Sequence, residues 1–198
     1  MKVLTFDIEI KNKVPMKNEP PTRYTYCDGW GDYENMGISF LGVHTSWDNR
    51  LTFFDENNLP DMVPLLTEAD VITGYNILGF DIPLLKATLV RKNCAPFPAF
   101  ADKIYDIFYD IRKNKKGTGW KLDDVAKHTL NISKSGDGAK APELWQDGDY
   151  AELINYLAQD VRVEAALFNH VFKYKQVTNG VKTIQLTEIE KFNYLDLI

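Results

Sequence analysis

The stretch from Asp149 to Tyr174, DYAELINYLAQDVRVEAALFNHVFKY, decides how the rest of the sequence is interpreted. Its apolar residues recur at three- and four-residue steps, which predicts one long amphipathic helix. Asp160 falls inside the apolar face of that helix, and Tyr156 lies one turn earlier at its margin. No Lys or Arg lies one turn away on this face, so a buried Asp160 must be neutralised or bind a cation. The helix therefore predicts a metal site with further oxygen ligands elsewhere in the chain.

Two acids lie near the end of a strand-like run at the N-terminus, MKVLTFDIEI, residues 1–10. Asp7 and Glu9 are two residues apart, so their side chains leave the same face of the strand. The other face is uniformly apolar, which predicts a central strand with packing on both sides. A third acid, Asp81, follows the apolar run 69–75 and begins a predicted helix with Pro83 in its first turn.

Each of these residues has a plain structural explanation when it is taken alone. Asp7 and Glu9 fit a solvated strand edge, Asp81 fits a helix N-cap, and Tyr156 fits the margin of a core. The combination favours a shared site, because Asp160 has no such explanation and three more acids stand where strands end and helices begin.

Three segments resemble, in order, the motifs of 3′–5′ exonucleases with four catalytic acids: FDIE at 6–9, NILGFD at 76–81 and YLAQD at 156–160. The third is similar to the tyrosine subclass, since the histidine subclass would have His where this chain has Asn155. The likeness runs from Met1 to about Tyr174 and points in particular to the exonuclease domain of family-B DNA polymerases and its stand-alone relatives. It implies a ribonuclease-H-like α/β fold.

The resemblance also implies how the site residues act. Two divalent metal ions would be bound, Mg²⁺ or Mn²⁺, because the ligands are hard oxygens and the sequence has no Cys/His cluster. Asp7 would bridge both ions, Glu9 and Asp160 would hold the first, and Asp81 would act largely through water on the second. Tyr156 would position the attacking water, since an ordinary tyrosine pKa near 10 makes it a poor base at neutral pH.

Two positions depart from the family pattern. Ile10 stands where the family often has Thr, so we do not expect this position to make the polar contact that the threonine makes to the terminal sugar. Glu164 stands one turn after Asp160, where the family tends to have a small or hydroxyl residue. Two roles are open for Glu164, a further acid that supports the site or a side chain turned towards solvent, and we expect the second.

The substrate-contacting candidates are Ile8, Asn76, Phe80, Lys134 and Lys140. The two lysines belong to the segment 133–145, which is predicted to be a loop that grips phosphates near the third motif. Phe80 either stacks on a terminal base or belongs to the core. An insertion at 11–35 mixes basic and aromatic residues, which fits a stacking platform for a single strand or a loop pinned to the sheet.

Composition is consistent with one domain over 1–198, since 198 residues with 44% hydrophobic side chains suffice for one core. The net charge of −5 predicts modest, salt-sensitive affinity for nucleic acid. Neither a membrane span nor a signal peptide is expected. Cys27 and Cys94 are two unremarkable thiols, which favours a cytoplasmic location, or the host cytoplasm for a viral protein.

The pattern predicts a mixed five-stranded sheet flanked by helices. Strands are expected near 2–10, 36–46, 50–55, 70–75 and 102–105, and helices near 60–68, 81–92, 106–113, 121–130 and 149–174. Asp106 is predicted to begin the helix at 106–113. Residues 181–188 are expected to add an edge strand or to pack against the long helix.

The function expected from these residues is a metal-dependent 3′–5′ exonuclease that releases nucleoside 5′-monophosphates, with single-stranded DNA favoured over RNA. Three alternatives remain: an exoribonuclease that trims RNA 3′ ends, an internally cleaving enzyme of the same fold such as a ribonuclease H or a resolvase, and a non-catalytic nucleic-acid-binding module. A terminally labelled strand would distinguish them.

Overall fold

The structure is a computed structural model that describes residues 1–17, 20, 22–92, 100–114, 118–133 and 138–192. The strands are β1 (Val3–Ile10), β2 (Ile38–Thr45), β3 (Arg50–Phe54), β4 (Val71–Gly74), β5 (Ile104–Asp106), β6 (Gln176–Thr178) and β7 (Thr183–Gln185). The α-helices are α1 (Tyr33–Met36), α2 (Val63–Glu68), α3 (Asp81–Arg91), α4 (Ile107–Asn114), α5 (Leu122–Leu130), α6 (Ala141–Asp147) and α7 (Tyr150–Tyr174). Short 3₁₀ turns cover Leu59–Met62, Ala101–Lys103, Gly138–Lys140 and Glu188–Phe192.

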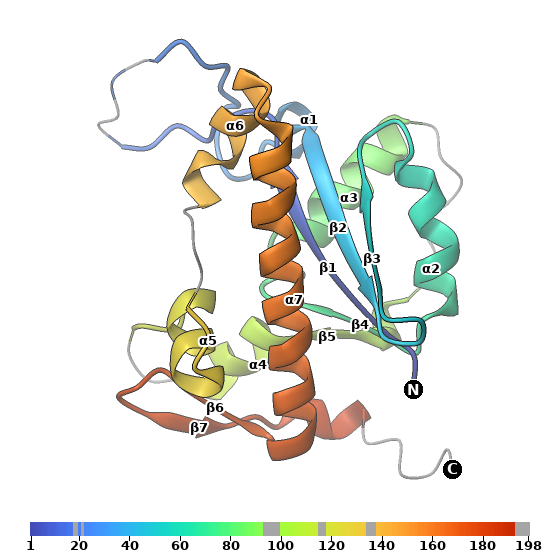
Figure 1. Ribbon diagram of the computed structural model, residues 1–198, viewed down its shortest axis with the longest axis vertical. Coiled ribbons are helices and arrows are strands. Elements are labelled where there is room, and N and C mark those ends of the chain that lie inside the picture. Colours follow the sequence, from blue (N-terminus) through green and yellow to red (C-terminus); the bar gives the residue numbers. More distant parts are fainter. Residues whose placement is uncertain (18–19, 21, 93–99, 115–117, 134–137, 193–198) are drawn as a thin grey trace.

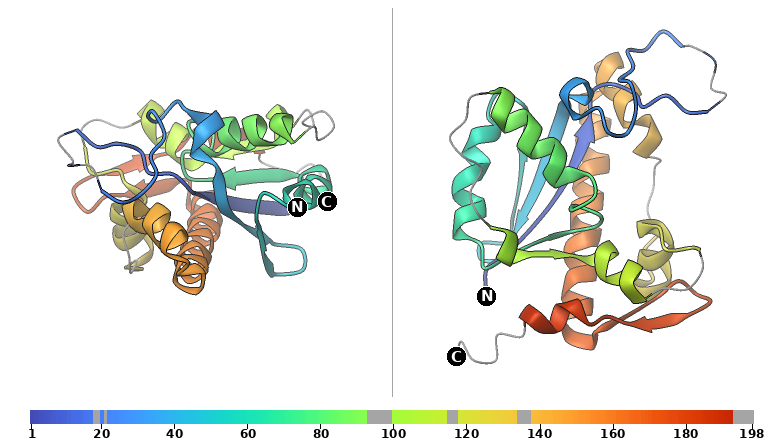
Figure 2. Two further views of the ribbon diagram at one scale, coloured as in Figure 1. Left: turned by 90° about the horizontal axis from the view of Figure 1, so that it is seen from above. Right: turned by 180° about the vertical axis from the view of Figure 1, so that it is seen from behind.

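Five strands form one mixed sheet in the order β3-β2-β1-β4-β5, so the first strand is central as predicted. The pairs β1–β2 and β2–β3 are antiparallel, whereas β1–β4 and β4–β5 are parallel. Helix α7 lies along one face of this sheet and α3 covers the other (Figures 1 and 2). The mixed five-stranded α/β architecture expected from the sequence is confirmed.

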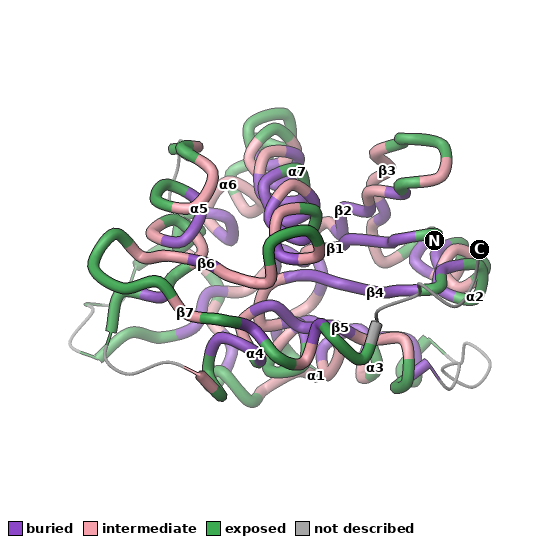
Figure 3. Tube along the Cα trace, turned by 90° about the horizontal axis from the view of Figure 1, so that it is seen from below, coloured by how far each residue is buried: buried purple, intermediate pink, exposed green. Residues whose placement is uncertain are grey.

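Strand β1 is packed on both faces. Its side chains point alternately to the two faces, so the acids lie on one face and the core residues on the other. Leu4, Phe6, Ile8 and Ile10 belong to the hydrophobic cluster that also contains Leu84, Leu85 and Leu89 of α3. The residues between them, including Asp7 and Glu9, face α7 instead. Figure 3 shows β1 and β4 buried along most of their length. The two acids therefore project from the most protected strand of the sheet.

A glycine lets α7 approach the sheet closely. Gly42 of β2 pairs with Asp7 of β1. A Cβ atom on Gly42 would lie 2.9 Å from Val161 Cγ2 and 3.0 Å from Leu157 Cγ, both of α7. These two fully buried side chains precede and follow Asp160 on the helix. The missing side chain at Gly42 thus sets how near Asp160 comes to β1.

The structure differs from the sequence prediction at three places. Helices α1 and α6 were not predicted, and α6 occupies the end of a segment that was expected to be a loop. Asp106 is the last residue of β5 rather than the start of the following helix. In the range 181–188, β7 pairs with β6 in a separate two-stranded sheet, so the expected edge strand on the large sheet is wrong. The other alternative agrees with the structure, since Leu186 shares a buried cluster with Leu167, Phe168 and Val171 of α7.

The close approach at Gly42 gives a test of the packing. Gly42→Val should lower the free energy of unfolding by about 1–3 kcal/mol, because its side chain would overpack the α7 interface. Gly31→Val is the control: no atom lies within 4 Å of a Cβ built on Gly31, and we expect a change within about 0.5 kcal/mol. Urea unfolding of both variants measures the difference. Equal stability of the two would contradict the packing described.

Candidate active site

Three carboxylates from two elements meet at the centre of the sheet. One carboxylate oxygen each from Asp7, Glu9 and Asp160 lies within 4.8 Å of the others. Strand β1 supplies the first two from its α7-facing side, and α7 supplies the third. Glu9 and Asp160 are buried, while Asp7 is half-buried. The strand register also shifts between Glu9 and Ile10, a bulge of the kind that re-aims side chains beside sites.

Asp81 adjoins this cluster but is not one of its three acids. It is the first residue of α3, and the backbone N–H of Ile8 donates to its Oδ1 at 3.0 Å. Burial, and then the charge of Asp7, raise the pKa of Asp81 well above 3.8. The second motif therefore brings its acid to the backbone of β1, next to Asp7.

Tyr156 is held against the acids as a neutral phenol. Its hydroxyl hydrogen-bonds to Asp160, and burial together with the charges of Asp160 and Glu9 raises the pKa of Tyr156 far above 10. A Cβ atom on Gly138 would lie 3.0 Å from the tyrosine hydroxyl oxygen, so the Gly138–Lys140 turn closes over this side of the site. At neutral pH the hydroxyl can orient a partner through a hydrogen bond but cannot act as a base.

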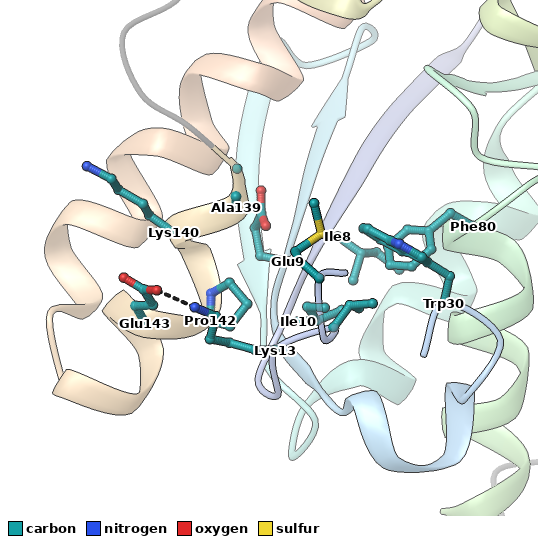
Figure 4. Close-up of a pocket in the computed structure, with 13 residues that line it drawn as sticks. Ile8, Glu9, Ile10, Lys13, Trp30, Phe80, Ala139, Lys140, Pro142 and Glu143 are labelled. Carbon is teal, nitrogen blue, oxygen red and sulfur yellow. Dashed lines mark hydrogen bonds and ion pairs between the residues drawn. The ribbon is translucent and has the colours of Figure 1, made fainter. Parts of the chain in front are cut away.

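A pocket of about 550 Å³ lies beside Glu9 (Figure 4). Apolar and aromatic side chains from the first strand, the insertion and the second motif form most of its wall: Ile8, Ile10, Val14, Met16, Trp30 and Phe80. Trp30 is 62% exposed, and its ring meets the ring of Phe80 edge-on with 5.8 Å between centroids. The pocket therefore presents flat apolar surface directly next to the acids.

The predicted substrate contacts separate into three groups. Ile8, Phe80 and Lys140 line the pocket, although Lys140 extends outward from it in Figure 4. Asn76 does not line it; its backbone N–H donates to Asp106, and its φ of 69° places it in the left-handed region. Lys134 lies outside the described residues, as does Cys94.

The insertion at 11–35 is pinned to α6 by its basic side chains. Lys13 pairs with Glu143 at 2.5 Å, and Arg23 pairs with Asp147 at 2.6 Å. Gln146 of α6 adds hydrogen bonds to the insertion backbone, donating to the carbonyl oxygens of residues 11 and 25 and accepting from the N–H of residue 25. Lys13 and Arg23 are thus engaged within the protein, and the aromatic surface that the insertion offers to the pocket is the Trp30 ring.

The expectation that Glu164 turns towards solvent is wrong. Only 2% of this residue is exposed, and a Cβ atom on Gly74 of β4 would lie 3.2 Å from its Oε2. The same Cβ atom would lie closer still to Ile77 Cγ2, at 2.4 Å, and to the Phe6 carbonyl oxygen, at 2.8 Å, so Glu164 is one of three close neighbours of Gly74. Sequence reasoning missed this pairing because it joins residues ninety positions apart. It also missed the contributions of Met16 and Gly138 to the site, for which no local signal exists.

Acids that meet on the central strand of a β3-β2-β1-β4-β5 sheet, with a helix across them, define a ribonuclease-H-like architecture. The sequence profile of the RNase_H superfamily matches residues 28–175, three quarters of the chain, and the chain belongs to that superfamily. The match includes Asp81, Tyr156 and Asp160 and begins after Asp7 and Glu9. Family and acid cluster together indicate a nuclease with divalent-metal ligands.

Among solved structures, the chain is similar to the family B DNA polymerase from the hyperthermophilic archaeon Pyrobaculum calidifontis. The TM-score is 0.65 at 23% sequence identity, over 86% of this chain and 24% of the polymerase. This chain thus spans about a quarter of that polymerase's length, and the likeness concerns the fold. A comparison with curated protein sequences finds no match. Within the described ranges, no helix combines the length and apolarity that crossing a bilayer requires.

The buried acid of the second motif makes a stability prediction. Folding raises the pKa of Asp81 above 3.8, so the folded chain keeps a proton on this carboxyl at pH values where the unfolded chain has lost it. The stability of the metal-free protein therefore falls as pH rises through the pKa of Asp81 in the folded state. Asp81→Asn keeps the acceptor for Ile8 but removes the charge. Without metal at neutral pH it should raise the free energy of unfolding by roughly 1–3 kcal/mol, and this gain should vanish in acid.

Chemical denaturation across pH in the presence of a chelator measures this effect. Asp61→Asn, at an exposed position, is the matched control and should change stability by less than about 0.5 kcal/mol. An Asp81→Asn protein that is less stable than the wild type at neutral pH would show that the carboxylate is not strained by its surroundings.

Proposed function

We propose that this chain is a metal-dependent 3′–5′ exonuclease of the tyrosine subclass, with single-stranded DNA as its favoured substrate. The observation that carries the proposal is the meeting of Asp7, Glu9 and Asp160 within 4.8 Å, with Tyr156 hydrogen-bonded to the last of them. Asp81 stands next to Asp7 as the fourth acid. The products would be nucleoside 5′-monophosphates.

The acids have the chemistry that Mg²⁺ or Mn²⁺ requires. Three hard carboxylate oxygens converge at a mostly buried point, where their mutual repulsion favours a bound cation. Asp7, Glu9 and Asp160 would hold the ions, and Asp81 would act through water. When bound, such ions neutralise charge on a phosphodiester and lower the pKa of an attacking water.

The chain's own groups position the reactants. Tyr156 stays neutral, so its hydroxyl serves to orient a water molecule and not to remove its proton. The pocket beside Glu9 would take the terminal nucleotide, with a base against Trp30 and Phe80. Apolar walls of this kind favour unpaired bases, because a paired base has its faces already stacked within the duplex. The polymerase with a similar fold is a DNA polymerase, which supports DNA over RNA.

A direct assay tests the proposal. Strands labelled at the 5′ end should shorten one nucleotide at a time in Mg²⁺ or Mn²⁺ and stay intact with chelator. Asp7→Ala and Asp160→Ala should each lower the rate by at least about a thousandfold, and Tyr156→Phe by roughly ten- to a hundredfold. Asp61→Ala, remote from the acids, should leave the rate unchanged.

The same gel separates the alternatives. Internal fragments would instead identify a ribonuclease-H- or resolvase-like enzyme, and faster shortening of RNA than of DNA would identify an exoribonuclease. Strand binding without hydrolysis in either metal would favour a non-catalytic nucleic-acid-binding module.

The pocket wall makes a separate prediction about affinity. Trp30→Ala should raise the KM for single-stranded DNA by about 5- to 150-fold at nearly constant kcat, since stacking on one base contributes about 1–3 kcal/mol. Tyr109→Ala removes another exposed aromatic side chain that does not line this pocket and serves as the control. Steady-state kinetics on an oligonucleotide of fixed length measure both. An unchanged KM in Trp30→Ala would remove Trp30 from the substrate site.

A further inference from the structure

The loop that joins β4 to α3 has an unusual backbone. Asn76 adopts a positive φ of 69°, and its carbonyl oxygen accepts the N–H groups of Gly79 and Phe80 at 3.0 and 3.1 Å. A Cβ atom at Gly79 would lie 2.6 Å from Asn76 Oδ1, so the turn is tight. Asparagine adopts this region more readily than most residues other than glycine, and surrounding contacts hold it there.

One buried carboxylate supplies those contacts. Asp106, at the end of β5, accepts the backbone N–H of Asn76 on Oδ1 at 2.9 Å and that of Leu78 on Oδ2 at 2.9 Å. It also accepts the N–H of Tyr109 at 3.1 Å, which ties the loop to the start of α4. Only 4% of Asp106 is exposed. A carboxyl group can accept several N–H groups at once, and two of these bonds restrain adjacent parts of the same loop.

The loop delivers two groups to the candidate active site. Phe80 lies at its end, where it lines the pocket and contacts Trp30. The next residue, Asp81, receives the Ile8 N–H and stands beside Asp7. Asp106 itself is not among the described residues that line this pocket.

We propose that Asp106 is a positioning residue that fixes the 75–80 loop so that Asp81 and Phe80 stand at the site. The assignment deepens the proposed function and rests on it. Asp106 acts through the loop backbone and touches neither substrate nor reacting atoms.

A second buried carboxylate on the same segment provides a matched comparison. Asp110 of α4 is fully buried and accepts the backbone N–H groups of Thr187, Glu188 and Ile189 at 3.0–3.2 Å. It pins the Glu188–Phe192 turn and makes no hydrogen bond to the 75–80 loop among the described contacts. The two aspartates therefore share burial, bonding type and helix neighbourhood, but only Asp106 is joined to the site.

The experiment compares Asp106→Asn with Asp110→Asn at a temperature where both are fully folded. Each change keeps one acceptor oxygen and replaces the other with an amide that cannot accept. Hydrogen exchange read by mass spectrometry should show the amides of residues 76–82 exchanging about tenfold faster in Asp106→Asn and unchanged in Asp110→Asn. In the same proteins, kcat for 3′-end hydrolysis should fall roughly ten- to a hundredfold in Asp106→Asn and stay within about twofold in Asp110→Asn.

Each outcome decides the assignment. Wild-type exchange and kcat in Asp106→Asn would overturn it, as would an equal loss of kcat in Asp110→Asn, which would show a general stability effect. If Asp106→Asn does not fold, Asp106→Glu, which keeps the charge but shifts the oxygens by a methylene, carries the same comparison. A wild-type chain that hydrolyses no 3′ end would defeat the proposed function, whereas the exchange result would still decide whether Asp106 fixes the loop.

Discussion

The distance between α7 and the sheet determines whether the acids of the helix can meet the acids of β1. Asp160 meets Asp7 and Glu9 because α7 packs directly on the backbone of Gly42, with Leu157 and Val161 where a side chain would otherwise be. Gly74 of β4, on the other side of β1, is similarly crowded: a Cβ atom there would lie 2.4 Å from Ile77 Cγ2, 2.8 Å from the Phe6 carbonyl oxygen and 3.2 Å from Glu164 Oε2. Two missing side chains, one on each neighbour of the central strand, thus allow a helix with buried acids to lie against a strand with acids of its own.

Such an arrangement has a thermodynamic consequence. Carboxylates held together away from water repel one another, and the raised pKa of Asp81 shows the repulsion and burial that the metal-free fold must tolerate. The hydrophobic clusters on both faces of β1 supply the stability that offsets this strain. A cation that binds only the folded chain would relieve it, so metal affinity and folding stability are linked through the same four acids.

Sequence reasoning could predict what depends on local periodicity. The strand with Asp7 and Glu9 follows from side-chain alternation, and the helix with Asp160 follows from apolar residues at three- and four-residue steps; their positions in the structure agree. Helix α6 had two sequence signals: Pro142 in its first turn, and Gly148, in the left-handed conformation, directly after its last residue. The glycines before it favoured a loop instead. Asp106 looked like a helix start, because nothing near it in sequence reveals that its partners are Asn76 and Leu78.

A count of basic residues in the insertion at 11–35 overestimates the positive charge of its surface. Its cations Lys13 and Arg23 face the acids of α6, so they hold the segment in place instead of adding to a positive face. Towards the pocket the insertion presents the apolar side chains of Val14 and Met16 and the ring of Trp30, which lies beside Phe80. With a net charge of −5, the chain has little long-range attraction for phosphates. In the proposed function, base stacking beside the acids would help to hold a strand, and it would favour bases that are free of a duplex.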